Sequence, residues 1–359
     1  MNWLQRILHK PFFIKLLHWE YWSMNTVYIP VYPVFAWYCL RSGWKYFFTA
    51  ADPNIDYGGF LMESKKKIYD QLPEGTYPKT ILLKPGTNAA AIKDILRKEN
   101  LSFPLLAKPD IGLRGFAVKK IETENDIETI ASKYTIDFLL QEFIHYENEV
   151  GIFYYRYPDE AKGKISGIVA KEFLTVVGDG QKTLLQLLQS DKRFVLQIDS
   201  LKKEYREEMD DVLKAGEKRL LVPYGNHARG AKFLDHSFKI DAQLENIIDE
   251  LLQKVPEFYF GRMDIRYNTW EELKQGKNLS IVELNGAGSE PTHIYDPKHS
   301  IFFAWKEILR HIKILWGISI MNHKRGFRFM TYSEGARMFR DNRRYVKKLK
   351  AVHQSLLHS

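Results

Sequence analysis

The spacing of apolar residues changes from a helical to a strand period several times in the first half of the chain. Residues 87–100 have helical spacing, with Ala89, Ile92, Ile95 and Leu96 on one side. Short segments at 77–83, 103–109 and 138–144 carry apolar runs that are typical of strands. This part is therefore predicted to combine short strands with amphipathic helices, one of them over 124–134 with Thr123 or Asn125 as its cap.

The second half of the chain continues the same mixture. Strands are predicted over 149–157 and 164–176, a helix opening at Leu184, and an amphipathic helix over 241–255. Residues 259–268 and 280–286 are predicted to be two paired strands joined by the polar hairpin 269–278, and a long polar stretch covers roughly 191–220. The pattern favours an α+β fold with two lobes around a cleft over one doubly wound sheet.

Polar side chains with metal-ligand chemistry alternate along the last two predicted strands. Arg262 and Asp264 alternate in "GRMDIR", and Glu283 and Asn285 alternate in "IVELN". Strand residues two apart point to the same side, so neighbouring strands would bring Asp264, Glu283 and Asn285 together. Hard oxygen ligands of this kind suit Mg²⁺. Arg262 shares the face and is expected to hold negative charge that develops at a reacting acyl or phosphoryl group.

Lysines and a glycine loop supply candidate phosphate contacts. Lys108 ends the strand "LLAKP", and the following "DIGLRG" contains Gly112 and Gly115. Backbone N–H groups of such a loop bind phosphate oxygens, although the two glycines also fit an ordinary hairpin turn. A second lysine lies about forty residues earlier, and the sequence does not separate Lys65 from Lys66 and Lys67. The segment "LLQEFI" offers hydrogen bonds to an adenine edge, and Glu149 offers an acceptor for ribose hydroxyls.

These motifs, in this order, resemble the ATP-grasp superfamily over roughly residues 64–297. "GRMDIR…IVELNGAGS" is similar to the D-alanine–D-alanine ligase branch. "VVGDGQKTLLQLL" and "NHARGAK" are similar to the cyanophycin synthetase and bifunctional glutathione synthetase branch. The resemblance implies an ATP-grasp fold whose two α+β lobes clasp ATP.

The resemblance also implies roles for individual residues. Lys65 and Lys108 would bind phosphates, and Glu283 would bridge two Mg²⁺ ions, with Mn²⁺ as an alternative metal. Arg262 would stabilise an acyl phosphate and a tetrahedral intermediate. The remaining implied contacts are Gln141 and Glu142 at the adenine amino edge, the backbone of Ile144, Glu149 on the ribose, Lys171 on a phosphate, and Arg229 and Lys232 on the γ-phosphate or a substrate carboxylate.

Two features depart from the family pattern. The usual N-terminal substrate domain is missing or reduced to an aromatic segment, and Arg114 replaces the small residues common in the phosphate loop of D-alanine ligases. Both departures leave the amino-acid substrates open. The domains expected on this basis are an aromatic-rich segment (1–60), the first part of the ATP-grasp region (61–145), the lobe with the metal site (146–320) and a basic helical tail (321–359).

Composition adds a question about membranes. The chain has 359 residues, a net charge of +9 and a single cysteine, Cys39, which fits a reducing cytoplasm. The first fifty residues hold five of the eight tryptophans, and residues 324–350 hold ten lysines and arginines against two acids. Aromatic and basic residues suit an anionic membrane surface, yet the same segments could pack on the core or form a solvated helix. The expected location is cytoplasmic, with a peripheral position on the inner face of the membrane left open.

The function predicted from these observations is a Mg²⁺-dependent, ADP-producing ligase that joins a carboxylate to an amine through an acyl phosphate. Its substrates would be small-molecule or lipid-linked acids and amines. Two alternatives remain open: an ATP-grasp phosphotransferase, with a phosphohistidine at His293, and a nucleotide-binding module at the membrane surface without turnover. No nucleic-acid partner is expected, since no recognised nucleic-acid motif accompanies the basic tail.

Overall fold

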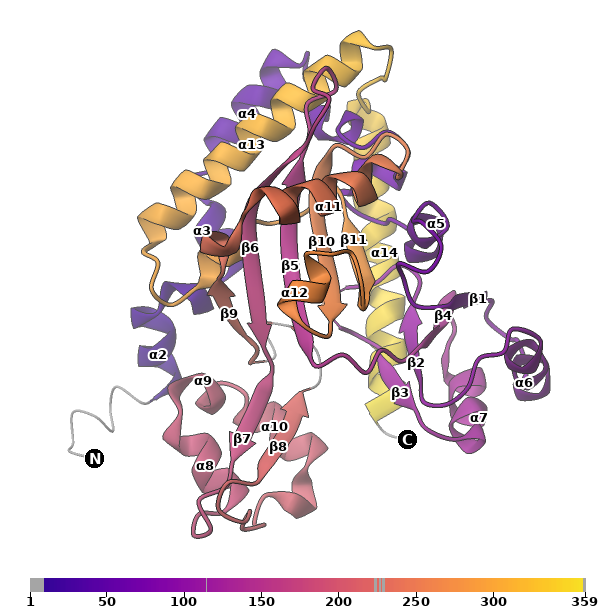
Figure 1. Ribbon diagram of the computed structural model, residues 1–359, viewed down its shortest axis with the longest axis vertical. Helices are drawn as coiled ribbons and strands as arrows, with labels where there is room; N and C mark the ends of the chain where they lie inside the picture. Colours follow the sequence, from indigo (N-terminus) through magenta and orange to yellow (C-terminus); the bar gives the residue numbers. More distant parts are fainter. Residues whose placement is uncertain (1–9, 114, 223–224, 226, 228–229, 358–359) are drawn as a thin grey trace. The chain divides into compact units, whose positions relative to one another are not determined.

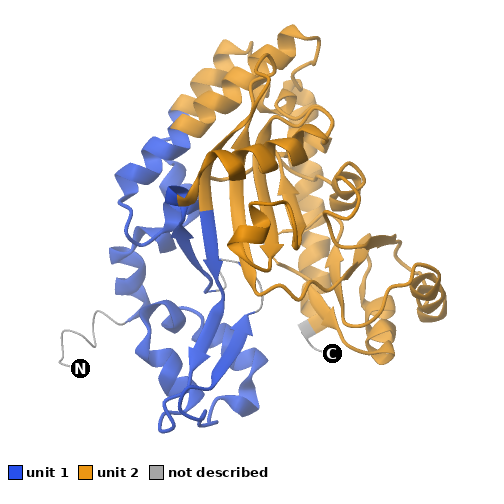
Figure 2. Cartoon of the chain, in the orientation of Figure 1, with its two compact units in different colours: residues 1–33, 169–238, 292–309 blue, residues 34–168, 239–291, 310–359 orange. Residues whose placement is uncertain are grey.

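The computed structural model describes residues 10–113, 115–222, 225, 227 and 230–357. The chain divides into two compact units, each built from three separate segments (Figure 2). The first unit contains residues 1–33, 169–238 and 292–309, and the second contains residues 34–168, 239–291 and 310–359.

Antiparallel strands form the centre of the second unit. The strands follow the order β11-β10-β5-β6 (Figure 1). Their bounds are β5 (Asn148–Tyr155), β6 (Lys164–Glu172), β10 (Phe260–Tyr267) and β11 (Leu279–Asn285). The expected pairing of the two polar strands is confirmed, because β10 and β11 are antiparallel neighbours. The expected hairpin between them also holds a short helix, α12 (Trp270–Leu273), which starts at a capping box made by Thr269 and Glu272.

Helix α11 (Ala242–Gln253) covers one face of these strands (Figure 1). Its apolar stripe, Leu244, Ile248 and Leu252, is fully buried in one cluster with Ile152 and Met263 of the strands. The apolar residues whose spacing predicted this helix are therefore the residues that pack it against the strands.

A second antiparallel sheet of the same unit follows the order β1-β4-β2-β3. Its strands are β1 (Thr80–Leu83), β2 (Leu105–Pro109), β3 (Lys119–Ile121) and β4 (Phe138–Glu142). Helices α6 (Ala89–Lys98), α7 (Glu124–Lys133) and α14 (Tyr332–Leu357) share its core through Ile92, Ile127 and Leu349, among others. The basic tail expected from the sequence is thus the long helix α14, and one face of it is buried.

The first unit has its own core. Strands β7 (Leu174–Val177) and β8 (Lys218–Val222) pair, and they pack on α8 (Leu184–Ser190), α9 (Lys192–Val195) and α10 (Ile198–Glu204). Residues 169–172 of β6 pair with β9 (Lys232–Asp235). Helix α8 begins at Leu184, as the sequence predicts, because Thr183 and Gln186 form a capping box.

The remaining helices are mostly short and lie near the N-terminus. They are α2 (Pro11–Leu17), α3 (Met24–Tyr28), α4 (Tyr32–Arg41) and α5 (Lys65–Tyr69); the long α13 (Ile301–Lys324) precedes α14. The α+β class is confirmed by these antiparallel sheets and the helices that cover them. Among the described residues, no helix combines the length and the apolar character needed to cross a bilayer.

Candidate active site

The register of β10 and β11 brings the predicted polar residues together in the second unit. Arg262 lies opposite Asn285, and Asp264 lies opposite Glu283. Directly opposed residues of an antiparallel pair point to the same face, so the four side chains form one polar patch at the end of the hairpin.

A β-bulge sets the direction of Glu283. The register shifts between Asp264 and Ile265, so that Val282 of β11 has no counterpart on β10. The hydroxyl of Tyr69, on α5, donates to the Val282 carbonyl at 2.5 Å. An extra residue re-aims the side chains that follow it, so the bulge turns Glu283 to the same side as Asp264.

Arg262 and Asp264 form a bidentate ion pair. Nε of Arg262 lies 2.8 Å from Oδ1 and its Nη2 lies 3.2 Å from Oδ2. Burial opposes the charge on Arg262, but the carboxylates of Asp264 and Glu283 outweigh it and raise the pKa of the guanidinium. The charged guanidinium also donates to the carbonyl of Glu290, in the loop that follows β11.

Lys65 is the cation that faces Glu283. Its Nζ lies 2.5 Å from Oε1 of Glu283. Burial would raise the pKa of Glu283, yet Lys65, Arg262 and Lys108 together hold it well below its usual range. Lys66 pairs with Asp70 instead, and Lys67 lies 2.9 Å from Asp56. Of the three adjacent lysines, Lys65 is therefore the one that reaches the polar patch.

Lys108 and the glycine loop lie against the same helix. Nζ of Lys108 is buried and donates to the Tyr69 hydroxyl at 2.9 Å. The backbone N–H groups of Lys65 and Lys66 donate to Asp110. A Cβ on Gly112 would lie 3.0 Å from Cε of Lys65. Gly115 has a φ of 77°, a backbone conformation that glycine adopts without strain, in the turn between β2 and β3.

Glu63 is a third carboxyl group near the patch. Burial raises its pKa most, Lys65 lowers it and Glu283 raises it again, with a net shift upward. The carboxyl group of Glu290 acts on Arg262 as well. The acidic side chains around Lys65, Lys108 and Arg262 are therefore those of Glu63, Asp264, Glu283 and Glu290.

The segment from β4 to β5, called the hinge here (residues 141–149), is held by Arg266. Nη1 of Arg266 donates to the carbonyls of Ile144 and Tyr146 at 3.2 and 3.5 Å, and its Nε lies 3.4 Å from Glu149. Glu149 is buried, and its expected ribose contact stays a prediction.

The two residues that begin the hinge have local partners. Gln141 is buried and its amide donates to the Thr80 hydroxyl at 2.7 Å. Glu142 is exposed and accepts from the backbone N–H of Lys79 at 3.3 Å. Their predicted place at the adenine edge is likewise untested.

The other predicted contacts belong to the first unit. Lys171 lies on β6 opposite Phe233, and Lys232 begins β9 with its Nζ 3.9 Å from Glu172. Arg229 lies outside the described residues. These residues stay predictions.

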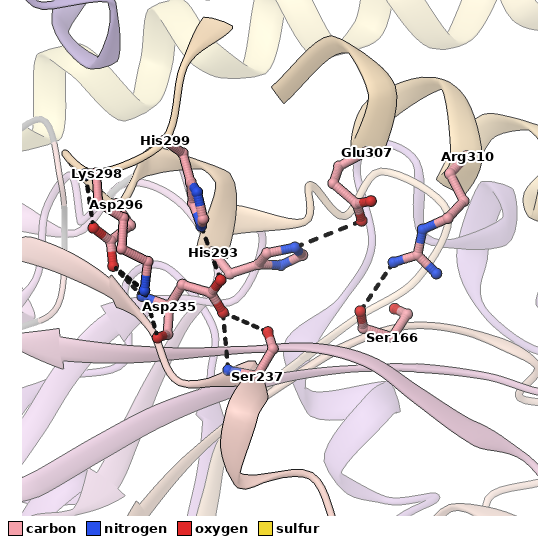
Figure 3. Close-up of polar contacts among 9 residues, drawn as sticks. All are labelled: Ser166, Asp235, Ser237, His293, Asp296, Lys298, His299, Glu307 and Arg310. Atoms are coloured by element: carbon pink, nitrogen blue, oxygen red, sulfur yellow. Dashed lines mark hydrogen bonds and ion pairs between the residues drawn. The ribbon is translucent and has the colours of Figure 1, made fainter. Parts of the chain in front are cut away.

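The first unit also holds a polar cluster that includes His293 (Figure 3). His293 is buried, and its Nε2 lies 3.7 Å from Glu307. Nε2 of His299 lies 2.8 Å from Asp235, whose backbone N–H donates to Asp296 at 2.7 Å. Figure 3 also draws a bond of the second unit, from Arg310 to the Ser166 carbonyl at 2.9 Å.

The chemistry of the polar patch fits a hard divalent cation. Asp264 and Glu283 supply two opposed carboxylates, and Asn285, which lies opposite Arg262, adds a side-chain amide whose oxygen is a further possible ligand. A group of three or more His, Cys, Asp or Glu side chains, as in a metal cage built by protein alone, does not occur in the described part of the chain. Two carboxylates with open positions are the set that Mg²⁺ uses together with phosphate oxygens.

Three residues around the patch were not foreseen from the sequence, although two left a signal. Arg266 continues the alternation of Arg262 and Asp264 on β10, and Tyr69 lies one helical turn after Lys65. Asp52, in contrast, lies in the turn "ADPN" and contacts β10 only in the folded chain, where it accepts from the N–H groups of Tyr259 and Phe260.

A cavity of about 400 Å³ lies beside the loop that follows the patch. Gly58 lines it, and the Gly58 carbonyl accepts from the N–H of Ala287 at 2.9 Å. Arg337, exposed on α14, lines the same cavity and has no ion-pair partner among the described residues, whereas Arg328 pairs with Glu334. The volume of the cavity is that of a small-molecule site, and the guanidinium group of Arg337 suits an anionic ligand.

Comparison with known proteins gives a likeness only at the level of solved structures. No protein-family model matches the chain, and no curated protein matches it. The VanG D-Ala:D-Ser ligase from Enterococcus faecalis is similar over 73% of this chain and 64% of its own, with 19% identity and a TM-score of 0.42. The D-alanine–D-alanine ligase from Bacillus anthracis is similar over 73% and 69%, with 14% identity and a TM-score of 0.42.

A bifunctional glutathione synthetase from Pasteurella multocida is similar over 73% of this chain, with 12% identity and a TM-score of 0.39. The chain spans only 38% of that protein's length. The TM-scores are below 0.5, so the likeness says nothing by itself about what this chain binds.

Proposed function

We propose that the protein is an ATP-dependent carboxylate–amine ligase. The observation that carries the proposal is the patch on β10 and β11, where Asp264 lies opposite Glu283 and where Lys65, Lys108 and Arg262 act on the Glu283 carboxylate. Opposed carboxylates suit Mg²⁺, and the cations beside them suit phosphate oxygens.

Asp264, Glu283 and Asn285 would hold Mg²⁺, which neutralises phosphate charge when it is bound. In the structure Lys65 takes the place of a cation at Glu283. With metal and nucleotide present, Lys65 would leave Glu283 for a phosphate oxygen, and Lys108 would reach the same phosphates from the Tyr69 side.

The reaction proposed has two steps. A carboxylate oxygen attacks the γ-phosphorus of ATP, the bond to the β–γ bridging oxygen breaks, and an acyl phosphate and ADP result. An amine nitrogen then attacks the acyl carbon, phosphate leaves with the electron pair of the C–O bond, and the nitrogen loses a proton. Arg262, fixed by Asp264 and charged at any working pH, would stabilise the oxyanion of the second step.

Two measurements on the purified protein test the proposal. Hydroxylamine traps an acyl phosphate as a hydroxamate, so ATP, a substrate carboxylic acid and hydroxylamine should give a hydroxamate and ADP in equal amounts. Mass spectrometry of products from a pool of acids and amines should show an amide that needs ATP. ADP release without hydroxamate or amide, whatever the acid, would contradict ligation.

The phosphotransferase alternative rests on one observation, the buried His293 beside Glu307. It predicts a phosphohistidine that is stable to base and labile to acid after incubation with labelled ATP. A His293→Gln variant would then lose the label, whereas a ligase would show no label in either form.

A further inference from the structure

Helix α4 (Tyr32–Arg41) is apolar on more than one side. Its sequence is "YPVFAWYCLR", and none of its residues is fully buried. On the inner side, Phe35, Tyr38 and Cys39 pack on the aromatic core of the second unit, and Tyr38 stacks on Trp316 of α13 at 4.8 Å. These inner contacts hold α4 on the second unit.

The outer side of α4 is also apolar and is open to solvent. Trp37 is 56% exposed, Leu40 is 40% exposed, and Trp44, in the turn after the helix, is 70% exposed. Trp37 and Leu40 are three positions apart, so they lie on one side of the helix, and the exposed Trp44 follows its end. A surface helix of a water-soluble protein normally carries polar residues there.

Cations border this stripe. Arg41 lies over the ring of Trp316, with its guanidinium carbon 4.8 Å from the ring centre, and Lys45 is exposed. Tyr46 forms an isolated β-bridge with Met330, and its ring stacks on that of Tyr332. Tyr332 is 72% exposed and begins the basic helix α14. Tryptophan, tyrosine and lysine or arginine together are the residues that occupy a membrane–water interface.

The helix is too short to span a membrane. Ten residues of α-helix extend about 15 Å, and the apolar part of a bilayer is about 30 Å thick. A short helix with an exposed apolar stripe and flanking cations is instead the kind that lies in the plane of an interface.

We propose that the outer stripe of α4, formed by Trp37 and Leu40, docks the protein on an anionic lipid bilayer together with the exposed Trp44 in the turn that follows. The net charge of +9 is complementary to such a surface, which favours lipid over an apolar protein partner. The proposal goes beyond the ligase activity and does not depend on it, because the residues of the stripe are outside the polar patch.

The test is sedimentation with vesicles of phosphatidylcholine and phosphatidylglycerol at low salt, with pure phosphatidylcholine for comparison. The full chain should pellet with the anionic vesicles and be released at high salt. A Trp37→Gln/Leu40→Gln variant should lose about tenfold or more in vesicle partitioning, because two exposed apolar side chains no longer enter the interface.

Two further variants separate membrane contact from other effects. Phe238→Gln removes a largely exposed aromatic residue elsewhere and should leave pelleting unchanged. Trp37→Phe should still pellet but show less quenching of tryptophan fluorescence by brominated lipid. The proposal is overturned if the unmodified protein stays in the supernatant, or if Trp37→Gln/Leu40→Gln pellets as well as it does. A change in self-association of that variant without vesicle binding would identify a protein interface instead.

Discussion

Asp52 has a carboxyl group that is fully buried beside the polar patch. Its Oδ1 accepts from the N–H groups of Tyr259 and Phe260 at 2.8 and 3.0 Å, where β10 begins. Its Oδ2 has no hydrogen-bond partner among the described residues. Burial raises the pKa of Asp52 from 3.8 to about 8, although the two N–H donors act in the opposite direction.

The protonation of Asp52 should make stability depend on pH. Between pH 3.8 and about 8 the folded protein keeps a proton that the unfolded chain has released, so stability falls as pH rises through this window. Asp52→Asn removes the titrating group. It should therefore remove up to about 1.4 kcal/mol per pH unit from the pH dependence of the unfolding free energy. The measurement is the difference in unfolding free energy between the two proteins, from urea titrations at pH 4, 6 and 8. A difference that stays constant with pH would show that Asp52 is ionised in the folded protein.

At the level of residues, the sequence identified the central part of the patch because strand alternation is a local rule. Arg262, Asp264, Glu283 and Asn285 share a face as expected. The ion pair of Lys65 with Glu283 joins residues 218 positions apart, and no local pattern indicates it. The preference for Lys65 over its neighbours also depends on the fold, because Asp70 and Asp56 bind the other two.

The loop after β11 is an element in which glycine is required by close packing. A Cβ on Gly286 would lie 2.6 Å from the Gly58 carbonyl oxygen and 2.9 Å from Oδ2 of Asp52. Gly286→Ala should therefore destabilise the protein by about 2 kcal/mol through overpacking. Gly75→Ala is the control, since open space surrounds Gly75 and only its positive φ opposes a side chain, at a cost of about 1 kcal/mol. The packing argument is contradicted if urea unfolding shows a smaller loss of unfolding free energy for Gly286→Ala than for Gly75→Ala.

The hinge should depend on Arg266. Arg266→Met removes the ion pair with Glu149 and the donors to Ile144 and Tyr146. If the hinge binds adenosine, the KM for ATP should rise about tenfold, the equivalent of one charge-assisted hydrogen bond, with a smaller change in kcat. Amide exchange in residues 142–149 should increase in the same variant. Faster amide exchange with an unchanged KM for ATP would show that the hinge is not part of the nucleotide site.

Most elements were predictable from the sequence because their signals are local. The stripe of α11 and the capped start of α8 are examples. The helix α12 was missed inside a polar hairpin, although Thr269 and Glu272 have the spacing of a capping box. The bulge at Val282 left no pattern in the sequence, because it depends on pairing with β10.

On the scale of the whole molecule, the units could not be foreseen. Each collects three separate segments, so that residues 34–60 share a unit with residues 310–359. Long-range contacts of this kind are not encoded in local periodicity. The domain ranges expected from the sequence stay a prediction.

The cavity lined by Gly58 and Arg337 is a candidate for the acid substrate. Arg337→Met should raise the KM for that substrate about tenfold, with the KM for ATP unchanged, because one guanidinium–carboxylate contact is lost. Arg340→Met, an exposed arginine of the same helix that does not line the cavity, is the matched control. Equal effects of the two substitutions would indicate a general charge effect.

The central claim is that Glu283 and its neighbours form a Mg²⁺–ATP site. The most direct measurement is ADP formation against Mg²⁺ concentration for the unmodified protein, Glu283→Gln and the exposed control Glu271→Gln. The account predicts that Glu283→Gln needs at least about tenfold more Mg²⁺ for half-maximal ADP formation, while Glu271→Gln behaves as the unmodified protein. An unchanged Mg²⁺ requirement and undiminished ADP formation in Glu283→Gln would contradict it, and would leave the pair with Lys65 as a structural ion pair.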